Sequence, residues 1–273
     1  MELVDAIKKR KSCRSFNADV LKISDRAELE KFINEKTLNL FDESLDLKVF
    51  GKEQPQKTMK LDYGMIKGHN TYILGKSKAT TDSRVNYGYQ LEKVVLKATA
   101  LGLGTCWVGY FDESYFDEIS VEEGYEIPGI VVVGYAQNKQ SGVEKLMRFS
   151  TKADKRLPWS QLFFHFQTKV PLSNVLTGRY EESFEMVRLA PSAGNTQPWR
   201  VFMDEARREF HFFKKPVNEK YEQKGLHDID MGIALAHFEL TSEKNRLNGS
   251  WLKHNEELID HFTDMKYCIS WKF

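Results

Sequence analysis

Arg188-Leu189-Ala190-Pro191-Ser192-Ala193-Gly194-Asn195-Thr196-Gln197-Pro198-Trp199-Arg200 lies two thirds of the way along this chain of 273 residues. Two prolines flank a small polar centre, so a helix predicted over 181–189 cannot continue through it. Gly194 and Asn195 tolerate a positive φ, and the surrounding side chains offer hydrogen-bond donors and acceptors. We expect a rigid polar loop suited to a ligand rich in oxygen and nitrogen. Proline-flanked turns without any ligand have the same composition, so a purely structural turn is the alternative.

Composition excludes several classes of function. The 40 basic and 39 acidic residues nearly cancel, and no basic block interleaved with aromatic residues is present, so neither nucleic acid nor an anionic membrane is expected as a partner. No apolar run approaches the roughly 18 residues that span a bilayer, and the basic start lacks a signal-peptide core. We expect a cytoplasmic protein. Three widely spaced cysteines and seven scattered histidines form no metal-binding motif, so no metal site is predicted.

The amino terminus combines a short helix with an anion-seeking segment. The apolar spacing from Leu3 to Ile7 predicts a helix that ends near Arg10. If the next residues are extended, Arg10, Ser12 and Arg14 share one side of the chain. Guanidinium and hydroxyl groups in this arrangement suit a phosphate and an electron-rich ring edge. A solvated basic surface is the alternative for such a cluster.

The first part of the chain predicts a sheet packed on a long helix. Ser24 is the expected N-cap of a helix that runs to Thr37. Strands are expected over 45–50, 71–74 and 127–135, with a polar loop over 51–60 and the longest helix over 82–101. This helix stops at Gly102-Leu103-Gly104-Thr105-Cys106-Trp107-Val108-Gly109-Tyr110, whose glycines permit close approach of a ligand to the backbone. A helix end leading into a strand is the alternative.

A second unit is expected to begin near Phe166. It has a helix over 181–189, a strand pair over 199–203 and 209–213, a second long helix over 228–240 and a terminal strand or arm over 262–273. These elements repeat, faintly, the order of the first unit. We therefore predict an α+β fold of two related halves, residues 1–165 and 166–273, each with a sheet packed around a long central helix.

Three of the strings quoted above resemble motifs of the FMN-dependent nitroreductase family. They are the Arg-x-Ser-x-Arg segment from Arg10 to Arg14, the G-L-G-T-C-W-x-G string from Gly102 to Gly109, and A-P-S-A-G-N-T-Q-P-W from Ala190 to Trp199. The resemblance implies a nitroreductase-like fold with bound FMN. In that family the Pro-Ser loop stands near the amino terminus and reaches the flavin of the other subunit in a dimer, whereas here it comes far behind Arg14.

The resemblance also implies which residues hold the cofactor. Arg10 and Ser12 would serve the phosphate and ribityl chain, with Arg156 closing the phosphate pocket, and Lys11 is a further implied contact. Arg14 would face the pyrimidine edge, and Lys67 would lie near the ring. The backbone at Val108 and Gly109 would lie near flavin N5. The remaining implied contacts are Thr105, Cys106, Trp107, Pro191, Ser192, Ala193 and Asn195. For Cys106, packing is favoured over a redox role, because no histidine is near it in the sequence.

The divided motifs imply two fused copies of one subunit. The first half keeps the Arg-x-Ser-x-Arg and glycine-rich strings, and the second keeps only the Pro-Ser loop. The resemblance thus implies a monomeric pseudo-dimer with a single FMN site. It would be an oxidoreductase that takes hydride from NADH or NADPH by a ping-pong route and passes it through flavin N5 to a nitroaromatic, quinone or similar flat small molecule.

Two alternatives to this activity remain at the level of sequence. One is an FMN-binding or sensing protein without turnover. The other is an enzyme that consumes the flavin or dehalogenates a substrate on the same fold, which would need a lid, and residues 51–67 are the candidate for it. No protein acid or base is required for hydride transfer through a flavin, so no catalytic side chain is assigned.

Overall fold

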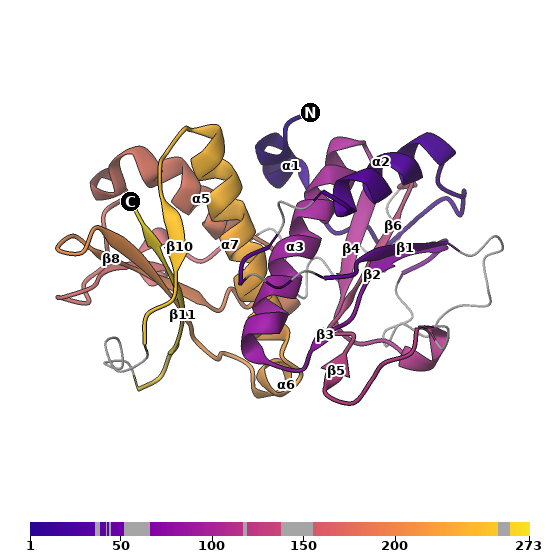
Figure 1. The fold of residues 1–273 in the computed structure, drawn as a ribbon. Helices are drawn as coiled ribbons and strands as arrows, with labels where there is room; N and C mark the ends of the chain where they lie inside the picture. Colours follow the sequence, from indigo (N-terminus) through magenta and orange to yellow (C-terminus); the bar gives the residue numbers. More distant parts are fainter. Residues whose placement is uncertain are drawn as a thin grey trace.

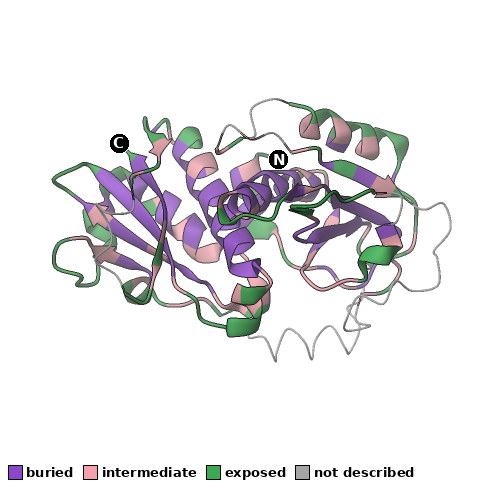
Figure 2. Ribbon diagram, turned by 60° about the horizontal axis from the view of Figure 1, so that its bottom comes forward, coloured by how far each residue is buried: buried purple, intermediate pink, exposed green. Residues whose placement is uncertain are grey.

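Two long helices lie side by side at the centre of the molecule: α3 (Thr81–Ala100) and α7 (Leu226–Lys244). The computed structural model describes residues 1–35, 39–41, 43, 45–51, 66–116, 119–137, 155–255 and 263–273. A sheet stands on either side of the helix pair (Figure 1). Both helices are buried over most of their length (Figure 2). No helix in the described ranges is both long and apolar enough to cross a membrane.

Glycines allow the two central helices to touch through their backbones. A Cβ atom on Gly88 of α3 would lie 2.1 Å from the carbonyl oxygen of Ile229, and one on Gly232 of α7 would lie 1.9 Å from that of Val85. Both separations are far below van der Waals contact, so only glycine fits. The contact is reciprocal. On each helix, the residue whose carbonyl is approached lies three residues before the glycine that approaches the other helix. Reciprocity of this kind characterises two-fold related surfaces.

The first sheet has the strand order β1-β2-β6-β4, with antiparallel neighbours throughout. Its strands are β1 (Lys48–Gly51), β2 (Thr71–Leu74), β6 (Ile130–Gly134) and β4 (Gly104–Val108). Val131 and Val133 pack toward α3, while Val132 packs on the other face with Tyr72 and Phe116. Helices α1 (Leu3–Lys9) and α2 (Ile23–Ile33), the short pair β3 (Ser77–Lys78) and β5 (Tyr125–Glu126), and η1 (Glu113–Phe116) complete this half.

The second sheet has the strand order β10-β11-β9-β8-β7. Its strands are β10 (Ser250–Leu252), β11 (Lys266–Lys272), β9 (Glu209–Lys214), β8 (Trp199–Asp204) and β7 (Phe163–His165), and only the β7–β8 pair is parallel. Phe210 and Phe212 of β9 pack against Phe238 of α7. The surrounding helices are α5 (Glu181–Leu189), α6 (Glu219–Gln223), η2 (Trp159–Gln161), η3 (Asn174–Tyr180) and η4 (Ala193–Asn195).

The two sheets share one chain order. With β7 left out, the first sheet reads β1-β2-β6-β4 and the second reads β8-β9-β11-β10, so in both the last two strands of the chain are exchanged in space. In each sheet the long helix connects the second strand of the chain to the third. A shorter helix precedes the first strand in each case, α2 before β1 and α5 before β8. β7 comes from the part of the chain predicted to close the first unit, yet it hydrogen-bonds to β8, so the second sheet is built from both parts.

Most predicted elements are confirmed, and several of their bounds are corrected. The helix over 181–189 and the strand over 71–74 have the predicted bounds. Ser24 is not an N-cap: α2 begins at Ile23, after Lys22, without a side-chain cap. The described helix ends at Ile33, and its predicted end at Thr37 lies outside the described residues. Residues 104–108 form strand β4, as in the alternative of a helix end leading into a strand, since they pair with all of β6.

The helix contact makes Gly232 sensitive to a single methyl group. Because its Cβ would overlap the Val85 carbonyl, we expect Gly232→Ala to lower the free energy of unfolding by about 3 kcal/mol. Gly129→Ala is the matched control, since its Cβ would meet nothing closer than 3.4 Å and should cost less than about 1 kcal/mol. Urea unfolding followed by circular dichroism measures both. Equal losses in the two variants would contradict the role given to the helix contact.

Candidate functional site

The amino-terminal segment is held along the edge of the first sheet. Arg10 caps the end of α1, and the chain then runs extended. Ser12 forms a parallel bridge with Thr105 of β4, and the Cys13 amide donates to the Thr105 carbonyl at 2.8 Å. The structure therefore brings the predicted residues of the Arg-x-Ser-x-Arg segment and of the glycine-rich string together through their backbones.

Arg14 and Lys67 are joined in the same way. The Lys67 amide donates to the Arg14 carbonyl at 3.0 Å, and the Phe16 amide donates to the Lys67 carbonyl at 2.9 Å. Gly68 permits this approach, because it has φ +70° and its Cβ would lie 2.2 Å from the Phe16 carbonyl oxygen. The Lys67 residue is exposed, whereas Arg14 is half-buried. Nη1 of Arg14 is buried and has no hydrogen-bond partner among the described residues.

Strand β4 supplies the next part of the site. Cys106 is buried and packs in the core with Tyr72 and Phe116, which fits the packing role preferred for it. The Trp107 indole donates to Glu92 of α3 at 2.8 Å. Val108 is the last residue of the strand, and Gly109 follows it. A Cβ on Gly109 would lie 2.7 Å from the Leu226 side chain, so the end of β4 lies against the start of α7.

The loop after α5 is polar, as its sequence predicts, and is closed by hydrogen bonds between its own residues. Gly194 and Asn195 both have φ +58°, as expected, and Gln197 has φ +50°, which was not foreseen. The Gln197 amide donates to Ser192 Oγ at 2.8 Å, and Thr196 Oγ1 donates to the Ala193 carbonyl at 2.9 Å. These bonds inside the loop fix its shape and turn it away from the axis of α5.

Arg156 lies against this loop. Its Nη1 donates to Asn195 Oδ1 at 3.0 Å, and its Nη2 donates to the Leu189 carbonyl at 3.1 Å. Asn195 Nδ2 donates in return to the Lys155 carbonyl at 2.8 Å, and the Leu157 amide donates to Gln197 Oε1 at 2.8 Å. The predicted phosphate residue and the predicted loop are therefore joined directly. Asp154, which stands beside them in the sequence, lies outside the described residues.

Two tyrosines connect the two groups of predicted residues. Tyr110, just beyond Gly109, has its ring centre 6.4 Å from that of Tyr221 in α6. The Tyr221 ring in turn lies over Gly194, where an added Cβ would come within 2.8 Å of it. The end of β4, the start of α7 and the Pro191 loop thus meet around α6. The parts therefore come from both predicted halves of the chain.

Asp230 of α7 is a site residue that the sequence motifs missed. Its Oδ1 accepts the Ala193 amide at 2.9 Å, while its Oδ2 is buried without a hydrogen-bond partner among the described residues. Burial raises the pKa of Asp230 well above its ordinary value, and the nearby Asp228 acts in the same direction. The sequence feature that could have pointed to Asp230 is the pair of acids in Asp228-Ile229-Asp230. They stand at the start of an apolar helix, where both cannot face solvent.

Asp230 should make stability fall with rising pH. The pKa of Asp230 is raised in the folded state above its unfolded-state value of about 4. The contribution of Asp230 to stability is therefore complete below that unfolded-state pKa. It is lost as the pH rises through the folded-state pKa. We expect Asp230→Asn to be more stable than the native chain at pH 7.5 by on the order of 1 kcal/mol, with no difference below about pH 4. Urea unfolding across this pH range measures it.

The control for Asp230 is Glu205→Gln, which alters an acid that is 63% exposed. This variant should leave the pH profile of stability unchanged. An Asp230→Asn chain that is less stable than the native one at pH 7.5 would contradict the assignment of a buried, costly carboxylate.

A solved structure of a bacterial protein aligns with nearly the full chain. The crystal structure of a "putative nitroreductase" from Thermotoga maritima aligns over 98% of this chain and 93% of its own, with a TM-score of 0.63 and 23% sequence identity. That likeness establishes the fold. No curated protein matches the chain.

Shorter nitroreductase structures align with about half of the chain. One from Bacteroides fragilis with bound FMN covers 52% of this chain and 91% of its own, at a TM-score of 0.42 and 15% identity. One from Desulfitobacterium hafniense, also with bound FMN, covers 51% and 92%, at a TM-score of 0.40 and 17% identity. The family model described as "Putative TM nitroreductase" matches residues 2–242. The chain therefore belongs to this nitroreductase family.

Proposed function

We propose that this chain is an FMN-dependent oxidoreductase of the nitroreductase type that uses NADH or NADPH to reduce a flat small molecule such as a nitroaromatic or a quinone. The observation that carries the proposal is Nη1 of Arg14, a buried donor that lacks an acceptor among the described residues. An unpaired buried polar group costs about 1–3 kcal/mol, so such a group in a native chain calls for a partner. The oxygen- and nitrogen-rich edge of a flavin offers one.

The other residues around Arg14 have the chemistry to hold the rest of FMN. Arg10 and Ser12 stand on the same extended segment and offer cationic and hydroxyl donors for a phosphate. The loop from Pro191 to Asn195, which is bonded by Asp230 and Arg156, would present small residues and backbone groups to the other side of the flavin. The open end of β4 at Val108 and Gly109 would face the ring. When bound, FMN supplies hydride transfer at N5, and the protein holds and orients it.

Arg156 has a second role in this proposal. Its guanidinium already bonds Asn195 and the Leu189 carbonyl, so it stabilises the loop as well as adding positive charge near the phosphate. Lys11 and Lys67 are exposed and would contribute charge without being buried by the cofactor. Cys106 would contribute through its backbone, because its side chain lies in the core.

We also propose that the chain is a pseudo-dimer in one polypeptide. The shared strand order of the two sheets and the reciprocal contact of Gly88 and Gly232 support this proposal. A further pair of groups flanks the helix crossing. Trp107 donates to Glu92, which pairs with His237 of α7 at 2.9 Å. Trp251 donates to Glu239, which pairs with Lys93 of α3 at 2.9 Å. Each indole thus binds a glutamate held by a base from the other central helix.

Arg14 provides the direct test of the flavin site. We expect Arg14→Ala to weaken FMN binding roughly 10- to 100-fold, as loss of a charged, buried hydrogen bond does, and Arg14→Lys to give an intermediate loss because lysine lacks the forked donor. Flavin fluorescence titration of the purified chain measures both. Arg179→Ala, an exposed arginine in η3, is the control and should bind as the native chain does. Unchanged binding in Arg14→Ala would remove the site assignment.

Stoichiometry and turnover test the pseudo-dimer and the enzyme separately. We expect one FMN per chain, from the visible spectrum and protein concentration, and a monomer by light scattering. The loaded chain should oxidise NADH or NADPH in the presence of a nitroaromatic or quinone. Two FMN per chain would contradict the single shared site but leave the family unchanged. Bound FMN without oxidation of either nicotinamide would favour the sensing alternative.

A further inference from the structure

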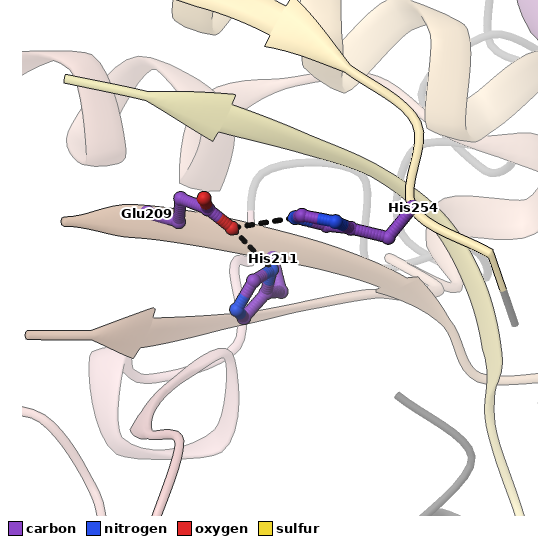
Figure 3. A group of neighbouring side chains, drawn as sticks. All are labelled: Glu209, His211 and His254. Atoms are coloured by element: carbon purple, nitrogen blue, oxygen red, sulfur yellow. Dashed lines mark hydrogen bonds and ion pairs between the residues drawn. The ribbon is translucent and has the colours of Figure 1, made fainter. Parts of the chain in front are cut away.

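A compact polar cluster lies in the second sheet, apart from the candidate flavin site. Phe210 and Phe212 of β9 point toward α7, so Glu209 and His211, which alternate with them, point to the opposite face of the sheet. His254 follows β10 and reaches the same place from the far side of β11. Figure 3 shows the two imidazole rings beside the Glu209 carboxylate, each approaching the same carboxylate oxygen.

The three side chains are already close to the spacing of metal ligands. Oε2 of Glu209 lies 2.6 Å from Nε2 of His254 and 3.8 Å from Nδ1 of His211. One ligand atom from each of the three residues lies within 4.8 Å of the others. In a tetrahedral zinc site with bonds of about 2.1 Å, donor atoms stand roughly 3.4 Å apart. An opening of about 0.8 Å between His254 and Glu209 would bring that pair to this spacing, and Nδ1 of His211, at 3.8 Å from Glu209, is already near it.

Burial and charge favour the protonation states that bind metals. The side chains of His211 and Glu209 are 1% and 6% exposed, and that of His254 is 16% exposed, which leaves one side of the cluster open to solvent. Burial lowers the pKa of His211 to about 4, so its ring is neutral at neutral pH. Burial acts to raise the pKa of Glu209. The hydrogen bond to His254 and the nearby Lys272 and His211 outweigh burial and hold the pKa of Glu209 below its ordinary value. A neutral imidazole and a carboxylate are the forms that coordinate metals.

The groups around His211 would orient its ring as they do for a metal-binding histidine. Its Nδ1 pairs with Ser270 Oγ at 2.7 Å, and that hydroxyl also pairs with Tyr267 at 2.8 Å, so Ser270 keeps a partner if an ion takes Nδ1. Its Nε2 is buried without a hydrogen bond among the described residues and lies 3.7 Å from Oδ2 of Asp204. Metal-binding histidines commonly direct their second nitrogen to a carboxylate.

Other charges near the cluster nearly cancel. Lys272 lies 3.3 Å from Oε1 of Glu209 and is about half exposed, so solvent screens it. Arg207 lies 3.7 Å from the Asp204 carboxylate and is likewise half exposed. A dipositive ion would thus meet two buried carboxylates and two exposed cations, while the two imidazoles supply neutral donors.

We propose that Glu209, His211 and His254 bind one divalent transition-metal ion, with Zn²⁺ as the best chemical match. Two imidazoles and one carboxylate suit zinc, whereas Ca²⁺ and Mg²⁺ prefer a shell of oxygen atoms. The fourth position would hold water at the open side. The ion would join β9 to the chain after β10 across the intervening β11, and so stabilise the second sheet.

Metal titration of the full chain tests this site without reference to the flavin. After treatment with a chelator and buffer exchange, the chain is titrated with ZnCl₂ by calorimetry and with CoCl₂ by visible spectroscopy. We expect one ion per chain, micromolar or tighter binding of Zn²⁺, cobalt d–d bands without thiolate charge-transfer bands, and a Tm raised by about 5 °C in excess zinc. His254→Ala should weaken binding about 100-fold.

Two ligand variants and one control variant distinguish loss of the metal site from a general loss of structure. His254 is partly exposed, so its replacement should leave the fold intact, and Glu209→Gln removes the shared carboxylate as a second, independent change. His165→Ala alters another partly exposed histidine of the same sheet and should bind zinc as the native chain does. The metal-free variants are first checked for native-like circular dichroism. No saturable binding, or equal affinity in the native chain, His254→Ala and Glu209→Gln, would overturn the proposal.

Discussion

The backbone contact between α3 and α7 at Gly88 and Gly232 is the constraint on which the rest of the structure depends. Because no side chain separates the helices there, residues one to two turns away face each other directly, and Glu92 pairs with His237 while Lys93 pairs with Glu239. The same closeness brings the end of β4 against the start of α7, where Gly109 meets Leu226. The candidate flavin site lies at this junction, so its geometry is set by how closely the two helices approach.

The two halves of the chain use the shared plan differently. In the first half, the segment around Ser12 and Cys13 covers the outer edge of β4. The strand in the corresponding place of the second sheet is β10, and the chain there lines a surface pocket of about 590 Å³ with Glu239, Trp251 and Trp271 among its walls. The chain before the second half brings β7 to the far edge of that sheet, beside β8, and supplies no second Arg-x-Ser-x-Arg. This difference supports one flavin site per chain over two.

Sequence reasoning succeeded where a local signal determines the local structure. Prolines and residues that tolerate positive φ define the Pro191 loop, and apolar periodicity defines α3, α5 and α7. Sequence reasoning failed where contacts between residues far apart in the chain determine the structure. The pairing of residues 104–108 with β6 and the bonds from Arg156 to Asn195 depend on partners far away in the chain. Asp230 was missed because its role comes from the Ala193 amide, and the Glu209 cluster was missed because His254 is far from the Glu-x-His pair in sequence.

The unpaired buried atoms are informative because of where they lie. Among the described residues, buried side-chain atoms without hydrogen bonds occur at Arg14, Trp159, Trp199, His211, His227 and Asp230. Each costs about 1–3 kcal/mol, so a fold keeps few of them without a compensating function. Arg14 lacks an acceptor and Asp230 lacks a second donor, and a heterocycle with both kinds of group on its edge can satisfy either. His211 lacks a partner on the nitrogen opposite its proposed ligand atom, where a bound metal would fix a proton facing Asp204. Stability given up at these positions is therefore expected to be recovered when each site holds its ligand.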